Sequence, residues 1–240
     1  MGVRAVPMQR SPRPGPRRAS TEEQVLDAAL ALLDDGGVDA ASVRGIAARI
    51  GVAPNAVYTY FADKAAVYRA IVERLLGEVD HGVFADREMP WPERVESLAL
   101  ELRARLSAHP GAVPLMISSP LDGPRALALN ERLLELFTDA GLDAADAARG
   151  SYLLIVYVFG SVALEVADAD RPGPLPPESE RVERRREAFA EADTEQYPRT
   201  TAAAETIAGY ISTEQFLWGL RRVLEGIVAR AAVGPAEVAR

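Results

Sequence analysis

The apolar residues of this chain recur at helical spacing, and this periodicity limits the folds that the chain can adopt. The first apolar stripe is formed by Val25, Leu26, Ala29, Leu30, Leu32 and Leu33. No stretch shows the period-two alternation that is typical of a half-buried strand. The β-branched run at 153–158 has helical patterns on both sides and no partner strand. We therefore predict an all-α fold.

Capping and helix-breaking residues divide the chain into helices. Ser20 and Glu23 have the spacing of a capping box, and the Gly36-Gly37 pair is expected to end the first helix. Pro54 is suited to the first turn of a helix, where its missing N–H costs nothing. Helices are predicted from 20 to Gly36, and at 43–50, 54–61, 64–80, 92–108, 124–140, 143–167 and 212–231, with a short proline-interrupted segment around 110–119.

Composition excludes several kinds of site. The chain has 240 residues, 48% of them hydrophobic, which is enough to fill a substantial core. It has no cysteine and only two histidines, His81 and His109. Disulfides, thiol nucleophiles and cysteine-based zinc sites are therefore excluded, and we expect no metal site and no cofactor.

The N-terminal segment at 1–19 is rich in arginine and proline and has little to bury, so we expect a disordered basic arm. It lacks the apolar stretch of a signal peptide. The longest apolar run, at 152–164, is shorter than the roughly 18 residues of a membrane span. We expect a cytoplasmic protein without a membrane segment.

The acidic charge is unevenly distributed. The formal net charge is −8, yet residues 1–80 hold ten basic and ten acidic groups, so residues 81–240 carry the whole excess. Between residues 42 and 69 there is one acid, Asp63, and there are four basic residues, Arg44, Arg49, Lys64 and Arg69. Attraction to phosphate depends on charge within about 8–10 Å. A basic N-terminal surface on an acidic body is compatible with nucleic-acid binding.

Two short helices joined at Gly51 form the arrangement of a helix-turn-helix, in which the second helix enters a major groove. The order of residues is Ser42-Val43-Arg44-Gly45-Ile46-Ala47, then Gly51-Val52, then Val57-Tyr58-Thr59-Tyr60-Phe61, then Asp63-Lys64. Over residues 20–70 this order resembles the tetracycline-repressor (TetR) family of bacterial transcription regulators. Weaker similarity to the C-terminal domain of the same family continues at Gly111-Ala112-Val113, Ser119-Pro120, 160–165 and 216–224.

The resemblance implies two domains. Residues 20–66 would form a three-helix helix-turn-helix DNA-binding domain, and residues 67–240 a larger helical domain for ligand binding and dimerisation. Within the second domain the Pro/Gly-rich and charged stretch at 168–211 is expected to be mostly flexible linker, with a short helix near 178–192. Its arginines 184–186 are expected to form a solvated face paired with nearby glutamates.

Eight residues are expected to contact DNA. A guanidinium fork such as that of Arg44 can bind a phosphate or a guanine edge, and Asn55 can pair with adenine. Lys64, at a helix N-terminus, is suited to a phosphate. Tyr58 and Thr59 offer hydroxyl groups and apolar surface on the outer face of the third helix. The complete set is Ser42, Arg44, Asn55, Ala56, Tyr58, Thr59, Tyr60 and Lys64.

A single three-helix unit covers too little DNA for high specificity, so we expect a homodimer on a palindromic operator. Family members pack two helices of each subunit into a four-helix bundle. The helix at 143–167 and the last helix are the candidates, with Gly160, Ser161 and Gly219 allowing close approach. One seam is expected at Phe216, Leu220, Leu224 and Ile227. The alternative is that these side chains form a purely intramolecular core.

The resemblance also implies a small-molecule effector that lowers operator affinity. Candidate ligand-binding residues, each of which could equally be ordinary core, are Leu102, His109, Met116, Ile117, Phe137, Tyr152, Val156, Phe159 and Glu165. Glu165 matches an acidic position of the magnesium site in tetracycline repressors, but Leu115 stands where they carry a histidine. An apolar, aromatic or polyketide-like ligand is therefore expected rather than a tetracycline–magnesium chelate.

Two other functions are alternatives for a chain of this fold. A helical small-molecule-binding or adaptor protein of the same fold would not bind an operator, and the low hydrogen-bonding capacity of Pro54 and Ala56 keeps this alternative open. An enzyme could pair His109 with Glu165 as a general-base dyad, but nothing in their spacing supports it. We expect the chain not to be an enzyme.

Overall fold

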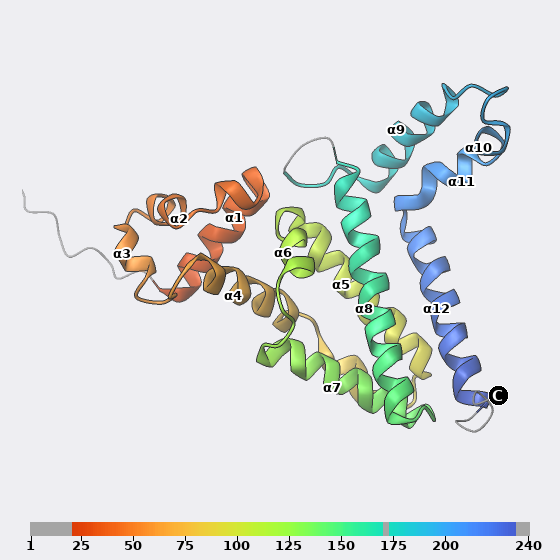
Figure 1. Cartoon of the computed structure of the whole chain (residues 1–240), viewed down its shortest axis with the longest axis horizontal. Helices are drawn as coiled ribbons and strands as arrows, with labels where there is room; N and C mark the ends of the chain where they lie inside the picture. The colour runs from red at the N-terminus through yellow and green to blue at the C-terminus, as the bar shows by residue number, and fades with distance from the viewer. Residues whose placement is uncertain (1–20, 170–172, 234–240) are drawn as a thin grey trace, which may run out of the picture.

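The computed structural model describes residues 21–169 and 173–233, and within these ranges all regular structure is helical (Figure 1). The all-α prediction is confirmed, whereas the basic arm lies outside the described residues. The α-helices are α1 (Glu22–Ala40), α2 (Val43–Arg49), α3 (Pro54–Val57), α4 (Lys64–Gly77), α5 (Trp91–Ala108), α6 (Val113–Ser118), α7 (Pro124–Asp139), α8 (Ala144–Ala167), α9 (Glu178–Ala190), α10 (Pro198–Ala202), α11 (Ala204–Ala208) and α12 (Thr213–Val233). Three short 3-10 helices are η1 (His81–Ala85), η2 (Pro110–Ala112) and η3 (Gly209–Ile211).

Helix α1 differs from the prediction at both ends. Its capping box is formed by Thr21 and Gln24, each side chain accepting a hydrogen bond from the backbone N–H of the other. The predicted cap Ser20 lies outside the described residues. Gly37 has a φ of +70°, which only a glycine adopts without strain, so the glycine pair kinks the helix instead of ending it.

The first four helices form an N-terminal unit at one end of the molecule (Figure 1). Gly51, at a φ of +70°, makes the sharp turn between α2 and α3. Ile46, Val57 and Phe61 are buried in the hydrophobic core with residues of α1 and α4. Helix α3 ends at Val57, earlier than predicted, and the chain continues to Tyr60 in turns.

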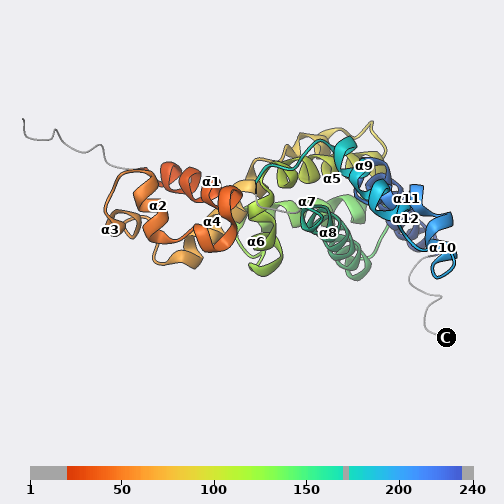
Figure 2. The same cartoon turned by 90° about the horizontal axis from the view of Figure 1, so that it is seen from above.

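The remaining helices form a larger body, which lies beside the N-terminal unit along the long axis of the molecule (Figure 2). Helix α8 packs against α5, α6, α7 and α12. The chain runs in opposite directions along α8 and α12 (Figure 1). By length and composition α8 could cross a membrane, a criterion that core helices of soluble proteins also meet.

The segment at 168–211 was wrongly predicted to be mostly linker. It contains α9, α10, α11 and η3, and α9 packs on α11 and η3. Arg185 binds Asp168, and Arg186 binds Glu205 with two hydrogen bonds of 2.7 Å. Of the local partners expected for the arginines, Glu183 pairs with Arg186. Long-range ion pairs therefore hold a segment whose composition is poor in apolar residues.

A buried ion cluster fixes this segment to the body. Glu165 on α8 binds Arg103 of α5 with two hydrogen bonds, at 3.0 and 3.1 Å, and Arg181 of α9 at 2.7 Å. Arg103 also donates to the Thr213 hydroxyl group, at 2.7 Å. Glu178 accepts hydrogen bonds from Thr213 and Arg103. Burial acts to raise the pKa of Glu178, but these hydrogen bonds outweigh it and lower the pKa below its usual range.

Two carboxylates of the N-terminal unit, Asp34 and Glu73, bind the body. Asp34 of α1 accepts hydrogen bonds from the backbone N–H of Gly111, at 3.2 Å, and lies 2.8 Å from Nδ1 of His109. Glu73 of α4 accepts the backbone N–H groups of Arg125 and Ala126, in the first turn of α7. Since Gly123 at the N-cap has no side chain, the Glu73 carboxylate serves as the cap of α7.

We predict that Glu165→Ala strongly destabilises the chain. Glu165 is 3% exposed and Arg181 is 4% exposed, so the substitution leaves two arginines without their shared carboxylate. Losing one partner of a buried ion pair costs about 3–5 kcal/mol of unfolding free energy. Equilibrium urea denaturation measures it. Glu96→Ala, which removes an exposed pair with Arg221, is the control and should have a far smaller effect. Equal losses would contradict the importance of the cluster.

We also predict that Gly111→Ala disturbs the joint between the two parts. A Cβ atom at Gly111 would lie 2.0 Å from the backbone oxygen of Leu33, so η2 must move away from α1. Overpacking of this kind costs about 1–3 kcal/mol. Gly209→Ala is the control, because its Cβ would meet nothing closer than Ser212 Oγ at 3.8 Å. Thermal denaturation compares them, and an unchanged melting temperature in Gly111→Ala would rule out the close packing.

Candidate functional site

Helix α2 begins at a side-chain cap and presents one arginine outward. The Ser42 hydroxyl group accepts a hydrogen bond of 3.0 Å from the backbone N–H of Gly45. Ser42 is therefore held as a helix cap, which is a structural role. Arg44 lies in the first turn of the helix and is exposed, whereas Ile46 and Ala47 on the opposite face are buried.

Helix α3 and the turn that follows it carry five of the eight residues predicted to contact DNA. Asn55, Tyr58 and Thr59 are exposed, Ala56 is half-buried, and Val57 faces the core. The Thr59 hydroxyl group donates to the backbone oxygen of Asn55, at 3.4 Å. Asn55 lies in the first turn of α3, after Pro54, and Tyr58 is the C-cap residue that follows the helix.

Lys64 lies at the start of α4, and its side chain already makes one hydrogen bond within the chain. Its ammonium group donates to the backbone oxygen of Val38, at 3.1 Å, and lies 5.1 Å from the centre of the Tyr68 ring. Tyr68 donates to the same oxygen of Val38. An ammonium group has three donors, so this contact leaves hydrogens for a phosphate. Asp63, the single acid between residues 42 and 69, caps α4 through the backbone N–H of Ala66.

The predicted DNA-contacting residues come from α2, α3, the following turn and the start of α4. These elements lie at the end of the molecule that is remote from α12 (Figure 1). Arg49 on the same unit is paired with Asp35 at 2.7 Å. On these elements Arg44 is exposed, Tyr60 is 39% exposed and Lys64 is half-buried, and we call this end of the N-terminal unit the terminal surface.

An apolar cavity of about 360 Å³ lies in the body. Its walls come from α4, α5, α7 and α8, and from Leu121 before α7. Of the predicted ligand-binding residues, Leu102, Tyr152 and Phe159 line it. Sequence reasoning missed the wall from α7, which includes Leu133 and Asn130. One signal in the sequence could have indicated this wall. Asn130 is a polar residue four positions after Ala126, on an otherwise apolar stripe of the helix.

The other six predicted ligand-binding residues lie elsewhere. Phe137 is fully buried against Trp91, with ring centres 5.7 Å apart, and Met116 is 1% exposed in the core. Ile117 and Val156 point outward, at 59% and 48% exposed. The remaining two bind other side chains: His109 contacts Asp34, and Glu165 binds the arginines of the buried ion cluster.

These partners also separate the candidate dyad. His109 contacts Asp34 at the joint with the N-terminal unit, whereas Glu165 lies between two arginines. The structure therefore does not bring His109 and Glu165 together as an acid–base pair.

In the described ranges no cluster of three or more potential metal-ligating side chains is found.

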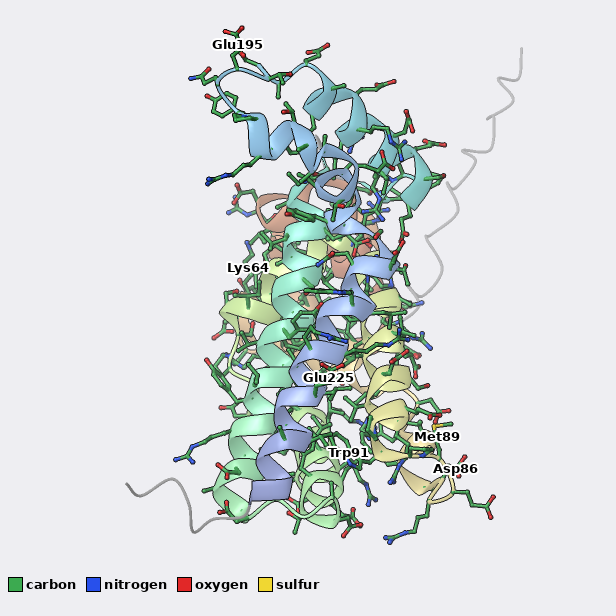
Figure 3. All side chains as sticks on the ribbon, turned by 90° about the vertical axis from the view of Figure 1, so that its right-hand side faces the viewer. Lys64, Asp86, Met89, Trp91, Glu195 and Glu225 are labelled. Atoms are coloured by element: carbon green, nitrogen blue, oxygen red, sulfur yellow. The ribbon has the colours of Figure 1, made fainter. Side chains whose placement is uncertain are left out.

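The predicted seam on the last helix faces the interior. Phe216, Leu220, Leu224 and Ile227 are all buried within the chain, which corrects their assignment to a subunit interface. The outward side of α8 and α12 carries another apolar set. Figure 3 looks onto this side, where the two helices lie next to each other in front and Glu225 marks α12. The exposed large apolar residues of α8 and α12 are Tyr152, Leu153, Val156, Leu164, Trp218 and Val228.

Comparison with known families agrees with both parts of the structure. Residues 25–71 match the family model of tetR-family bacterial regulatory proteins. Residues 85–231 match the model of the tetracyclin repressor-like C-terminal domain. The second match alone covers more than half of the chain.

Individual relatives cover different shares of the chain. An HTH-type transcriptional regulator of Saccharopolyspora erythraea is 32% identical over 60% of this chain and 61% of its own length. The HTH-type transcriptional repressor DrrR1 of Streptomyces coeruleorubidus is 25% identical over 91% of this chain and 81% of its own. ActR of Streptomyces coelicolor, in a crystal structure with actinorhodin, has the same fold, with a TM-score of 0.72, 23% identity, and coverage of 93% of this chain and 100% of ActR. The chain belongs to the tetR family of bacterial regulatory proteins.

Proposed function

We propose that the chain is a DNA-binding transcriptional regulator, a homodimeric repressor that a small apolar ligand releases from a palindromic operator. The observation that carries the proposal is that one helix serves both sites. Helix α4 begins with Lys64 on the terminal surface of the N-terminal unit, and Leu76 near its other end lines the apolar cavity. A ligand that moves α4 changes the position of the DNA-contacting surface.

DNA reading is assigned to the terminal surface. Asn55 is the side chain suited to an adenine edge, Arg44 binds guanine or phosphate, and Tyr58 and Thr59 contact thymine methyl groups or phosphates. Tyr60 and Lys64 bind phosphates and fix the register on the duplex. Ser42 and Ala56 contribute through the position of the backbone, since Ser42 caps α2 and Ala56 is half-buried.

The exposed apolar side of α8 and α12 is assigned to dimerisation. It combines 74%-exposed Leu164 with 59%-exposed Trp218, and an exposed apolar set of this kind is typical of an interface. Gly160 and Gly226 would meet nothing within 4 Å if they carried a Cβ atom, so a second subunit can approach closely there. Two such helices per subunit would form a four-helix bundle.

Ligand release is assigned to the contact between α4 and α7. Ala126 lines the cavity and also donates its backbone N–H to Glu73 of α4. A ligand that displaces the first turn of α7 therefore acts on α4 directly. This coupling requires the ligand to bind the DNA-free conformation more tightly than the DNA-bound one.

The relatives support this assignment. DrrR1 is named a transcriptional repressor, and ActR has been crystallised with actinorhodin. We infer a cytoplasmic regulator without enzymatic activity, since a regulator of transcription acts where the DNA is. The second candidate, a ligand-binding protein of the same fold without an operator, is favoured only by the low hydrogen-bonding capacity of Pro54 and Ala56.

Lys64→Ala tests the DNA surface. The variant should bind duplexes of any sequence more weakly, and the slope of log K against log salt should fall by about one for each bound subunit, because one phosphate contact is lost. Fluorescence anisotropy with a random-sequence duplex at several salt concentrations measures it. Arg199→Ala removes the same charge from exposed α10 and should leave the slope unchanged. Parallel slopes for Lys64→Ala and the unmodified chain would refute the phosphate contact.

Leu164→Glu tests the dimer surface. A carboxylate in the centre of an apolar interface is costly to bury, so the variant should sediment as a monomer at micromolar concentration where the unmodified chain is a dimer. Analytical ultracentrifugation distinguishes the two. Tyr58→Glu introduces the same charge at a 51%-exposed residue of the N-terminal unit and should remain dimeric. A dimer of normal stability in Leu164→Glu would place the interface elsewhere.

A further inference from the structure

The lining of the apolar cavity contains very few polar groups. No Lys, Arg, His, Asp or Glu side chain is among the described residues that line it. Two lining side chains carry hydrogen-bonding groups, Asn130 of α7 and Tyr152 of α8. Tyr152 is 71% exposed, so its ring lies at the outer edge of the cavity. Asn130 is half-buried and is therefore the polar group of the interior wall.

Asn130 is held in one orientation by a buried serine. The Ser151 hydroxyl group, in a residue that is 1% exposed, donates to Oδ1 of Asn130 at 2.7 Å. In the part of the chain that the structure describes, the Asn130 side chain makes no further hydrogen bond. One lone pair of the amide oxygen is thus used, and the two N–H donors of the amide are left for another partner.

We propose that Asn130 donates a hydrogen bond to a carbonyl oxygen of an uncharged, largely apolar ligand, and that Ser151 positions the amide for it. This inference rests on the proposed function of the cavity and specifies the class of ligand. It makes Asn130 the residue that determines specificity and Ser151 a positioning residue.

The chemistry of the walls selects this class over charged ligands. A carboxylate or an ammonium group would lose its hydration without meeting an opposite charge, which is strongly unfavourable. A pure hydrocarbon would fill the space but leave the amide donors unpaired, and a buried donor without a partner is costly. A ketone or related carbonyl compound satisfies the donors and keeps the rest of the lining dry. Sites built around a hydrogen-bonding group discriminate in this way against analogues that lack the partner atom.

Fluorenone and fluorene form a matched pair of probes, since they share a planar tricyclic skeleton and differ by a carbonyl in place of a methylene group. Equilibrium dialysis of each probe against the full chain gives two dissociation constants. Their ratio, fluorene over fluorenone, is compared between the unmodified chain and Asn130→Leu, so that differences in water solubility cancel. We expect the ratio to fall about tenfold in Asn130→Leu, the effect of one net hydrogen bond, while fluorene still binds.

Ser151→Ala is the second variant and keeps Asn130 in place. Its ratio should fall as well, although less, because the amide is free to rotate; a merely structural role of Ser151 would change both constants equally. Asn130→Ala replaces Asn130→Leu if the leucine variant does not fold. A ratio that stays the same in every Asn130 variant would overturn the proposal.

Charge is tested with fluorenone carboxylate, which should bind at least tenfold more weakly than fluorenone, and tighter binding of this anion would overturn the uncharged class. The outcomes also separate this inference from the function on which it rests. If both probes bind the unmodified chain with a ratio that Asn130 does not change, the cavity remains a ligand site and only the role of Asn130 is wrong. If neither probe binds, the ligand-binding function of the cavity fails, and the Asn130 proposal fails with it.

Discussion

Helix α4 belongs to two packed units at once, and the rest of the structure depends on this constraint. Val67 and Ile71 are buried in the core that α4 shares with α1, and Leu76 reaches the cavity of the body. Glu73, between them, caps α7 through two backbone N–H groups. Because protein interiors are closely packed, a shift of α7 cannot be absorbed without moving α4. The same helix begins with Lys64 at the terminal surface, so the proposed ligand site and the proposed DNA surface share one helix.

The body combines two very different interiors. Between α5, α8 and α9, Glu165 joins Arg103 and Arg181 in a buried cluster that fixes α9 to the core. Leu102 and Phe159, on the same helices α5 and α8, border a cavity with no charged side chain among its described lining residues. The charged cluster needs every partner, since a buried charge is tolerated only when it is paired. The described residues that line the cavity form no ion pair, so the proposed ligand would not have to break one.

Local patterns predicted the helices well, whereas contacts between distant residues escaped them. The apolar periodicity and Pro54 at the start of a helix indicated α1 and α3, because these signals act within one turn. The segment at 168–211 was misread because its helices are held by ion pairs to Asp168 and Glu165, which composition does not reveal. Leu220 faces the interior, and Glu165 pairs with two arginines instead of lining the cavity. Both outcomes depend on which helices are neighbours. For the cavity, periodicity marked apolar faces but not which of them border empty space, so Leu102 was identified and Leu133 was missed.

Selection of bound sites from a randomised duplex library tests the central claim, that this chain reads DNA as a symmetric dimer, most directly. The purified full chain and its Asn55→Ala variant are compared at about 150 mM salt, since lower salt favours non-specific binding. We predict an enriched inverted repeat for the unmodified chain, with half-sites about one helical turn apart, and loss of one base preference in each half-site for the variant. A folded dimer that enriches no sequence would contradict it.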